Sequence, residues 1–323
     1  MSFLKHLSRR QVKDGIHVAF DNCVTRFFLW RRPSYGKRYD ISLCAIFKNE
    51  APFLREWIEY HHMVGVDHFY LYNNNSEDGF RDVLQPYQER GWVTLADWPH
   101  NQDQMGAYRH FYENCRDQTQ WACFLDIDEF IVPRYHTDLH DWIRTMDRFP
   151  VIVVYWQMFG TSGRLRHDYS RYVIEQYTVS WDRLYHVGKC FFNTDYDIAR
   201  FDATTHHLTS VLVPVAGTSL RRRIGPVDPS RRFVKAARPG GSQLGSEREY
   251  RRKTIQINHY WSKAWEVYEM KRQMTDVYFK ENPKKDLAYF YRHEHNNRAA
   301  DRVIFRFLMQ LKLTAGENAQ GNG

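Results

Sequence analysis

The chain of 323 residues lacks an apolar run long enough to cross a bilayer, which takes about 20 consecutive residues. Its mean hydropathy is −0.67. The basic segment at residues 1–10 is not followed by the apolar stretch of a secretory signal peptide. We therefore expect neither a membrane-spanning helix nor secretion.

Cysteine is scarce, and the few cysteines form no recognisable pattern. There are five, an odd number, and no Cys-x-x-Cys pair occurs among them. A small secreted domain would show an even set at regular spacings, and a zinc site would show paired ligands. We expect free buried thiols in a reducing cytoplasm. The five are Cys23, Cys44, Cys115, Cys123 and Cys190.

Acidic residues are outnumbered, which gives a net charge of +8. The excess is concentrated in residues 5–38 and 221–253. Neither segment carries a helix-turn-helix, zinc-finger or RNP-type signature, so we expect no nucleic-acid partner. A basic surface in peripheral contact with an anionic membrane fits better. Residues 27–30 (FFLW) could lie on that membrane, or the leader could form a helix packed back on the domain.

What the chain has is a sizeable core, with 43% hydrophobic and 16% aromatic residues. We predict a basic leader at residues 1–38 and one main domain at 39–283. Within that domain, residues 217–253 are rich in Gly, Pro, Ser and Arg, and we predict a mobile loop that orders over a bound ligand. A helical segment at 284–314 and a disordered tail at 315–323 complete the chain.

Strand and helix patterns alternate through the first third of the chain. Apolar runs at 41–47, 68–72 and 93–96 read as strands, and the segments at 53–65, 82–90 and 104–115 read as helices. A strand–helix–strand unit makes its two strands parallel neighbours, so the fold class is α/β with an open, largely parallel sheet. Polar residues follow the strands in turn, namely Lys48, Asn49 and Glu50, then Asn73 and Asn74, then Asp97.

The stretch at 121–130 (WACFLDIDEF) is an apolar run that ends in three carboxylates. If the strand continues, Asp126 and Asp128 share a face because side chains alternate along a strand. Two close carboxylates repel unless a cation lies between them, and oxygen ligands suit Mg²⁺ or Mn²⁺. The alternative is a solvated strand end with two surface aspartates. Four strands that all end in polar residues, with the acidic pair last, favour a nucleotide-sugar site.

Several short segments together resemble glycosyltransferase family 92 and its bacterial family-2-like relatives, roughly over residues 41–311. The resemblance implies a GT-A fold, which is a nucleotide-diphospho-sugar transferase fold with a Rossmann-like mixed sheet flanked by helices. It also implies a sugar-nucleotide donor, a divalent cation and inversion at the anomeric carbon. The segments are 46–50 (IFKNE), 56–61 (EWIEYH), 65–76 (GVDHFYLYNNNS), 124–130 (FLDIDEF), 159–163 (FGTSG) and 258–263 (NHYWSK).

The same resemblance implies roles for the residues around the donor. Asp126 and Asp128 match the metal-binding Asp-x-Asp, with Asp128 the better direct ligand, and His259 resembles the late histidine that completes the coordination. The alternative for His259 is a purely structural histidine. Lys263 would pair with the diphosphate at the start of a helix over 263–279 that Ser262 caps.

Glu50 and Asn73 match positions that line the nucleobase and ribose pocket, and we include Lys48, Asn49, Asn74, Asp97 and Asp126 among the donor-binding residues. Relatives often carry an acidic residue near Asn74 that would accept from the uracil N3–H. Asparagine stands here instead, so UDP is favoured without being fixed by this position.

Residues 151–156 and 171–177 read as strands, and the glycine-bracketed loop at 159–163 lets backbone approach a sugar ring. An inverting transfer needs a carboxylate that takes the proton of the acceptor hydroxyl. Asp168, just past the loop, is our candidate for this base, with Glu175 and Asp195 as rivals and an exposed loop aspartate as the alternative reading. Of the adjacent pair His206 and His207, we expect at most one to face the site.

The sequence therefore predicts a metal-dependent glycosyltransferase that uses Mn²⁺ or Mg²⁺ and a nucleotide-sugar donor. The acceptor is a hydroxyl of a surface glycan or a lipid-linked glycan, as in polysaccharide or lipopolysaccharide biosynthesis, and the location is cytoplasmic or peripheral on the inner membrane face. Two alternatives remain: a catalytically inactive GT-A module that binds sugar nucleotide or a partner protein, and a basic nucleic-acid-binding protein.

Overall fold

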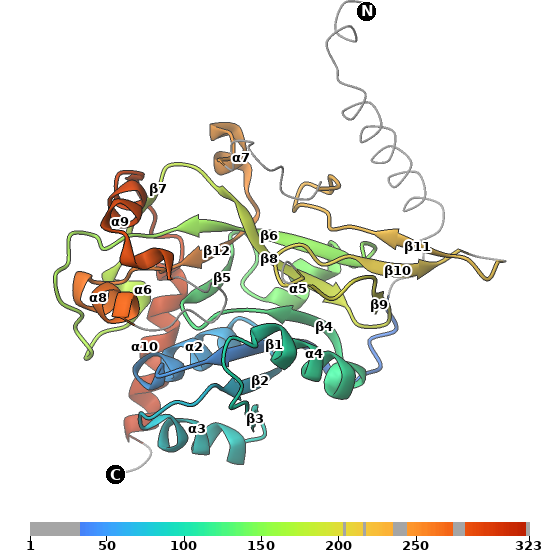
Figure 1. Cartoon of the computed structure of the whole chain (residues 1–323), viewed down its shortest axis with the longest axis horizontal. Helices are drawn as coiled ribbons and strands as arrows, with labels where there is room; N and C mark the ends of the chain where they lie inside the picture. Colours follow the sequence, from blue (N-terminus) through green and yellow to red (C-terminus); the bar gives the residue numbers. More distant parts are fainter. Residues whose placement is uncertain (1–32, 203–204, 216–217, 235–243, 274–281, 321–323) are drawn as a thin grey trace, which may run out of the picture.

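The computed structural model describes residues 33–202, 205–215, 218–234, 244–273 and 282–320 (Figure 1). Most of the predicted basic leader, residues 1–32, lies outside these ranges, as do the positions of Cys23 and of parts of the predicted loop and tail. None of the helices in the described ranges is long and apolar enough to cross a membrane.

An eight-stranded mixed sheet runs through the molecule in the order β3-β2-β1-β4-β8-β6-β12-β5. β1 pairs in parallel with β2 and β4, and β2 pairs in parallel with β3, whereas β8 and β5 run antiparallel to their neighbours. This confirms the predicted α/β class and the GT-A arrangement. The strands are β1 (Tyr39–Phe47), β2 (His68–Asn73), β3 (Val93–Asp97), β4 (Thr119–Phe124), β5 (Glu129–Pro133), β6 (Val151–Met158), β8 (Tyr185–Asn193) and β12 (Ile255–His259).

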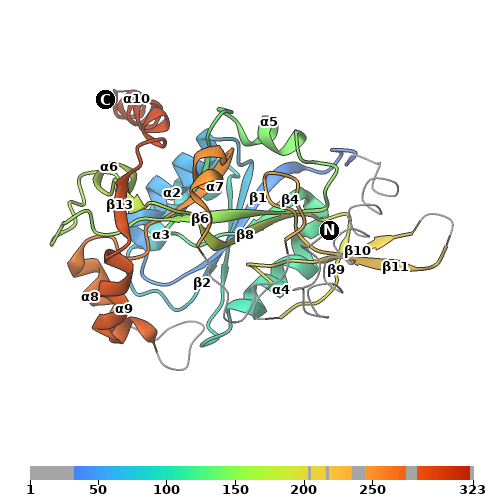
Figure 2. The ribbon, with the colours of Figure 1, turned by 90° about the horizontal axis from the view of Figure 1, so that it is seen from above.

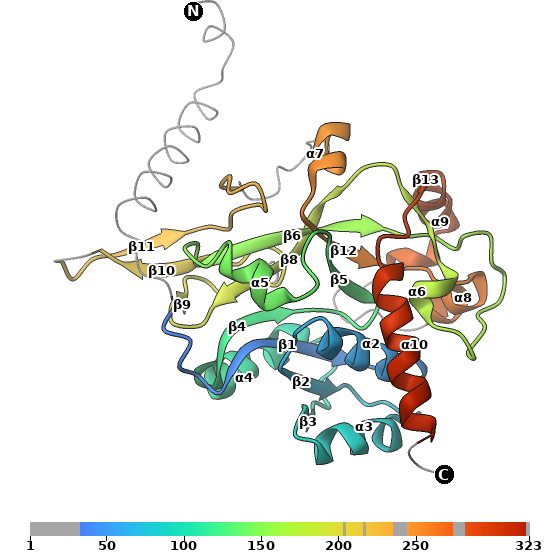
Figure 3. The same ribbon diagram turned by 180° about the vertical axis from the view of Figure 1, so that it is seen from behind.

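Both faces of the sheet are covered, which explains why its central strands read as continuous apolar runs. On β1, Leu43 and Ala45 belong to one hydrophobic cluster while Cys44 and Ile46 belong to another. The first cluster includes side chains of α2 (Ala51–Met63), α3 (Phe80–Glu89), α5 (Leu139–Arg144) and α10 (Phe305–Gln320). These helices lie on the near side of the sheet in Figure 3.

The second cluster lies on the opposite face, beneath α4 (Gln104–Cys115) and a small three-stranded sheet. That sheet consists of β9 (Asp197–Ile198), β10 (Val211–Pro214) and β11 (Arg221–Ile224). Figure 2 shows the β10–β11 hairpin extending away from the main sheet. The four cysteines in the described ranges are free, and three of them are buried.

A third, aromatic cluster joins the C-terminal elements to the sheet, with Trp181, Trp261, Tyr268 and Phe290 as members. The remaining elements are η1 (Arg116–Gln118), α6 (Val173–Gln176), β7 (Val179–Trp181), α7 (Glu247–Arg252), α8 (Trp265–Gln273), η2 (Pro283–Lys285), α9 (Leu287–Glu294) and β13 (Asn297–Ala300).

Regular elements extend into two segments that the sequence predicts as a mobile loop and a disordered tail. Within the region predicted as a loop, β11 and α7 are regular elements, because β11 pairs with β10 and Ser246 forms a capping box with Glu249 at the start of α7. α10 continues to Gln320, into the segment expected to be disordered.

The strand expected over residues 171–177 is the short helix α6, and a distant side chain explains the difference. The carboxylate of Glu56 accepts hydrogen bonds from the backbone N–H groups of Val173 and Ile174 at 2.6 and 3.0 Å. These bonds satisfy the first turn of α6. Burial raises the pKa of Glu56 to about 7, although the two backbone bonds oppose that rise.

Candidate functional site

The polar residues that follow the strands meet at one edge of the sheet. β3, β2, β1 and β4 are parallel to one another. β8 is antiparallel to both β4 and β6, so β6 points the same way as β4, and β12 is parallel to β6. The carboxyl ends of six strands therefore lie along this edge. Ligands bind at such strand ends in open α/β sheets.

Asp126 and Asp128 lie on this edge, but not on a shared strand face. β4 ends at Phe124, and the backbone N–H of Glu129 donates to the Asp126 carbonyl at 3.1 Å, which closes a turn. The alternation used to place both carboxylates together applies to a strand and not to a turn. Their side chains consequently reach different partners.

Asp126 is held by a lysine from β8. Lys189 is fully buried, and its Nζ lies 2.8 Å from Asp126 Oδ2 and 3.7 Å from Glu129 Oε2. Burial disfavours the Lys189 cation, yet the two carboxylates raise its pKa above the ordinary value. Burial also raises the pKa of Glu129 well above its usual range, against the pull of Lys189. Lys189 thus neutralises a carboxylate that sequence analysis assigned to a metal ion.

Asp128 contacts two cationic or basic groups, one through each oxygen. Lys271 Nζ from α8 lies 2.7 Å from Oδ2, and His259 Nε2 at the end of β12 lies 3.5 Å from Oδ1. Burial pushes the pKa of Asp128 upward, but Lys271 and His259 outweigh it and hold that pKa well below the usual range. The carboxylate is therefore ionised across the whole physiological range.

Asp128 and His259 fit a divalent ion, whereas Asp126 does not. Within the described ranges no group of three His, Cys, Asp or Glu side chains converges as a metal cage. Mg²⁺, however, is commonly held by one or two protein ligands plus substrate phosphates. The 3.5 Å between Asp128 Oδ1 and His259 Nε2 lies within the span of two ligands that each sit about 2.1 Å from one ion. The buried Nδ1 of His259 makes no hydrogen bond.

Lys263 is the most unusual residue at this edge. Its side chain is fully buried, and its Nζ makes no hydrogen bond. Glu50 Oε2 lies 4.0 Å away, and the Phe53 ring centroid lies 4.1 Å away. Burial, followed by the neighbouring Lys271, lowers the pKa of Lys263 to about 8. An ammonium group buried without an acceptor is costly unless a ligand supplies one.

The backbone at Lys263 corrects the predicted start of the following helix. Lys263 has a φ of +51°, a left-handed conformation that costs a non-glycine residue about 1–3 kcal/mol. α8 therefore begins at Trp265, and Ser262 does not cap it. The N–H groups of Trp265 and Glu266 donate to loop carbonyls of residues 164 and 165 at 3.0 Å, so they are not free for a diphosphate.

A polar network joins the ends of β2 and β3. Asn73 Nδ2 donates to Asp97 Oδ1 at 2.8 Å, and Arg81 binds both Asp97 oxygens at 2.9 Å. These bonds lower the pKa of Asp97, with the Asn73 amide as the largest cause. Asn74 is buried, and its amide donates to backbone carbonyls of residues 98 and 100, so it fixes a loop. The sequence predicts that Asn74 binds the donor, whereas its amide N–H groups bind this loop in the structure.

Residues after β1 lie beside this network. The backbone N–H of Asn49, a residue with a φ of +55°, donates to Ser76 Oγ at 2.9 Å, and the Asn49 side-chain oxygen accepts from the Glu77 N–H at 2.8 Å. Lys48 is half-buried at the end of the strand. These contacts join the loops after β1 and β2.

The side chains of His206 and His207, of which at most one is expected to face the site, lie against each other. Residues 205–207 form a turn, in which His206 is buried, His207 is half-buried and their ring centroids lie 3.8 Å apart. His207 Nδ1 donates to the Gly188 carbonyl at 2.7 Å. Burial, followed by nearby Lys189, lowers the pKa of both imidazoles, to about 3 in His207. Both rings are therefore neutral at pH 7.

The sequence model of glycosyltransferase family 92 matches residues 37–210, which is more than half of the chain. The chain belongs to glycosyltransferase family 92. The matched range contains β1 through β4, Asp126 and Asp128, but it ends before His259 and Lys263.

Curated family 92 proteins from plants share this segment. One from Oryza sativa subsp. japonica is 34% identical over 141 residues, which is 42% of this chain and 24% of that protein. One from Arabidopsis thaliana is 28% identical over 138 residues, again 42% of this chain and 24% of that protein. The similarity thus spans about a quarter of the length of these relatives.

Solved structures with some likeness include S. aureus TarS 1–349 in complex with UDP, at a TM-score of 0.29 and 13% identity over 40% of this chain and 38% of that one. Another is glucosyl-3-phosphoglycerate synthase from Mycobacterium tuberculosis, at a TM-score of 0.30 and 13% identity over 51% of this chain and 63% of that one. Likeness of this size indicates nothing about the ligands of this family 92 chain.

The three candidates for a general base lie in different surroundings in this family 92 protein. Asp168 is exposed, and its Oδ1 accepts from the N–H and the hydroxyl of Ser170, which lowers its pKa. Glu175 is bound by Arg171 and Lys312. Asp195 pairs with Lys37 near the amino ends of β1 and β4, at the opposite edge of the sheet.

Two lysines of the site, Lys189 and Lys271, are absent from the sequence-based prediction. Lys189 was detectable as a single charge inside the buried strand β8 (YHVGKCFFN). Lys271 lies 143 residues from Asp128 on an ordinary polar helix, and no local pattern indicates that it reaches Asp128.

Proposed function

We propose that this family 92 protein transfers a sugar from a nucleotide-diphosphate donor to a hydroxyl of a glycan or a lipid-linked glycan. The observation that carries the proposal is the fully buried ammonium of Lys263, which has no hydrogen-bond acceptor and lies at the ligand-binding edge of the sheet. A diphosphate would supply the missing acceptor oxygens. UDP is the favoured nucleotide.

In this proposal Lys263 and Lys271 bind the diphosphate oxygens. The pKa of Lys263 is about 8, so its ammonium is charged at pH 7 and stays charged while the leaving group gains negative charge. A fixed cation in a desolvated position stabilises such charge far better than a cation in water. The strained backbone of Lys263 fits a residue positioned for this task.

Of the three metal ligands that the sequence predicts, Asp128 and His259 would hold Mn²⁺ or Mg²⁺, whereas Asp126 would not. When bound, the ion would neutralise diphosphate charge as a Lewis acid. Lys271 occupies only Oδ2 of Asp128, so it orients the carboxylate and leaves Oδ1 toward His259. Asp126 is bound by Lys189 through Oδ2. Its Oδ1 accepts long hydrogen bonds from Gln104 Nε2 at 3.4 Å and from the Tyr108 hydroxyl at 3.5 Å, and a ribose hydroxyl would replace one of these two donors.

The nucleobase would lie beside β2 and β3. The Asp97 carboxylate, oriented by Asn73 and Arg81, would accept from the N3–H of uracil. Glu50 and Lys48 would line the ribose side of the same pocket.

Asp168 remains our candidate for the general base of an inverting transfer. Its loop packs against α2 and α8, because the neighbouring His167 contacts Phe53 at 5.3 Å between ring centroids and the His167 N–H donates to Glu266 at 2.6 Å. The expected location, cytoplasmic or peripheral on the inner membrane face, is part of the proposal and rests on sequence alone.

A second candidate function is a donor-binding module without turnover. It is favoured by the position of Asp168, whose carboxylate is exposed and bonded within its own turn, with a lowered pKa that makes it a weak base. Donor binding without any transfer product would support this candidate.

A thermal-shift panel of UDP-, GDP-, CMP- and dTDP-sugars, each with Mn²⁺ or with EDTA, tests the donor site. We expect stabilisation by one nucleotide class, reduced by EDTA and by Lys263→Met. Mass spectrometry of donor and acceptor mixtures then separates the transferase from the binding module. A folded protein that none of these nucleotides stabilises would contradict the proposal.

A further inference from the structure

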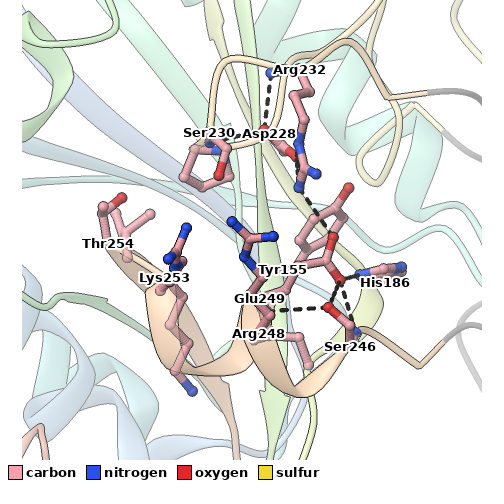
Figure 4. A pocket seen from close by; sticks show the side chains of 14 residues that line it. Tyr155, His186, Asp228, Ser230, Arg232, Ser246, Arg248, Glu249, Lys253 and Thr254 are labelled. Carbon is pink, nitrogen blue, oxygen red and sulfur yellow. Dashed lines mark hydrogen bonds and ion pairs between the residues drawn. The ribbon is translucent and has the colours of Figure 1, made fainter.

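A separate pocket of about 350 Å³ lies on the other side of β6 from the donor site. α7, the loop at residues 228–232 and the starts of β8 and β12 enclose it, and their side chains face one another across it in Figure 4. Tyr155 lines this pocket beside His186, at 4.8 Å between ring centroids. The next residue on β6, Trp156, instead packs 4.5 Å from His259.

Both carboxylates in the pocket are fully engaged. Asp228 accepts from the N–H groups of Ser230 and Arg232 and from Arg232 Nε, at 2.8–3.0 Å. Glu249 accepts from the Ser246 N–H at 2.8 Å and pairs with Arg232 at 3.1 Å and His186 at 3.3 Å. An incoming ligand therefore meets few free acceptors here.

Donors, in contrast, remain available. Arg248 and Arg252, which line the pocket from α7, have no carboxylate partner anywhere in the described ranges. The ammonium of Lys253 is occupied elsewhere, by Gln157 Oε1 at 2.7 Å and by Asp301 at 3.6 Å. The pocket thus contains three arginines and two carboxylates, and the guanidinium groups of Arg248 and Arg252 are free to bind an anionic ligand.

We propose that this pocket binds a phosphomonoester group. A phosphomonoester carries a charge of about −1.5 to −2 at pH 7 and offers three acceptor oxygens, which two guanidinium forks can bind in pairs. The apolar part of the wall, formed by Tyr155, Leu184 and Ile255, would contact the organic part of the ligand. A carboxylate offers one charge and two oxygens, so it matches the pair of arginines less well.

The test compares Arg248→Gln/Arg252→Gln with the control Arg251→Gln. Arg251 lies on the same helix, pairs with Glu247 and has a side chain that is 74% exposed. The control therefore removes a guanidinium charge that lies outside the pocket. Calorimetric titrations use inorganic phosphate, glucose 6-phosphate and glucuronate, and a flotation assay uses phosphatidylcholine vesicles with and without phosphatidic acid. UDP binding is measured in parallel on every variant.

We expect phosphate and glucose 6-phosphate to bind the wild type, and affinity to fall about tenfold or more in the double variant because charge-assisted bonds are lost. The control should keep its affinity, and UDP binding should be unchanged in all variants, which separates this pocket from the donor site. Binding of vesicles alone would identify a lipid headgroup as the source of the phosphate, and binding of the soluble esters would identify a free metabolite.

Three results would overturn the proposal. One is equal loss in the control, which would indicate general surface charge. Another is glucuronate binding as tightly as glucose 6-phosphate. The third is the absence of binding to any phosphate-bearing probe.

Discussion

Replacing Lys189 with methionine tests the buried charge cluster that organises the Asp126 turn. The substitution keeps an unbranched side chain but leaves Asp126 and Glu129 without their cation. Removal of one partner from a buried ion pair costs about 3–5 kcal/mol. Asp126 is 34% exposed at its side chain and can be hydrated, whereas Glu129 is fully buried. We therefore expect the low end, about 3 kcal/mol.

Urea unfolding followed by circular dichroism measures the effect. With a slope of about 3 kcal/mol per molar urea, the midpoint should fall by about 1 M. The loss should also depend on pH. Burial already raises the pKa of Glu129, so the folded state binds its proton more tightly than the unfolded state does. Loss of Lys189 raises that pKa further, so the variant should lose stability as pH rises above about 4.5.

A second substitution provides the control for this reasoning. Lys189→Met/Glu129→Gln removes the carboxylate as well as the cation, so it should recover part of the stability and flatten the pH dependence. A single Lys189→Met variant that unfolds within about 0.5 kcal/mol of the wild type, with no added pH dependence, would refute the account of the cluster.

Three further predictions concern other parts of the molecule. The hydrogen bond to Asp67 is the main cause that raises the pKa of His140 to about 9. The stability that protonated His140 contributes is therefore complete below pH 6.5 and is lost as the pH rises through 9. His140→Gln should lower the free energy of unfolding in urea by about 2 kcal/mol at pH 6, and a variant with the pH profile of the wild type would contradict this prediction. Lys263→Met should weaken UDP binding at least about tenfold in calorimetry without lowering the melting temperature, because the substitution removes a buried cation that has no acceptor. A destabilised variant with normal UDP affinity would instead show that Lys263 stabilises the fold. Gly188→Ala would place a Cβ 1.9 Å from the Val154 carbonyl oxygen on the neighbouring strand. We expect the free energy of unfolding in urea to fall by about 3 kcal/mol, and an unchanged free energy would contradict the observed strand spacing.

The first four strands and three helices could be predicted from sequence because each is a strong local pattern. The apolar runs of β1, β2 and β4 are buried on both sheet faces, and α4 has the predicted bounds Gln104–Cys115. The polar ends of these strands followed from the parallel order, so the edge that carries the site could be predicted as well.

The details of the site depend on contacts between distant residues, and no local pattern shows which residues those contacts join. The Asp126 turn is fixed by Lys189 from another strand, and Lys271 reaches Asp128 from a helix near the other end of the domain. α6 exists because Glu56 caps it from α2. In each case a tertiary contact outweighed the local pattern from which the prediction was made.

The most direct test of the proposed donor site is calorimetric titration of UDP into wild-type protein and Asp128→Asn, each with Mn²⁺ and with EDTA. We expect UDP to bind the wild type with an affinity that falls strongly in EDTA, and to bind Asp128→Asn weakly with an affinity that EDTA hardly changes. Equal UDP affinity in the two proteins, or no binding to a folded wild type, would contradict the claim that Asp128, His259 and Lys263 form a nucleotide-diphosphate site.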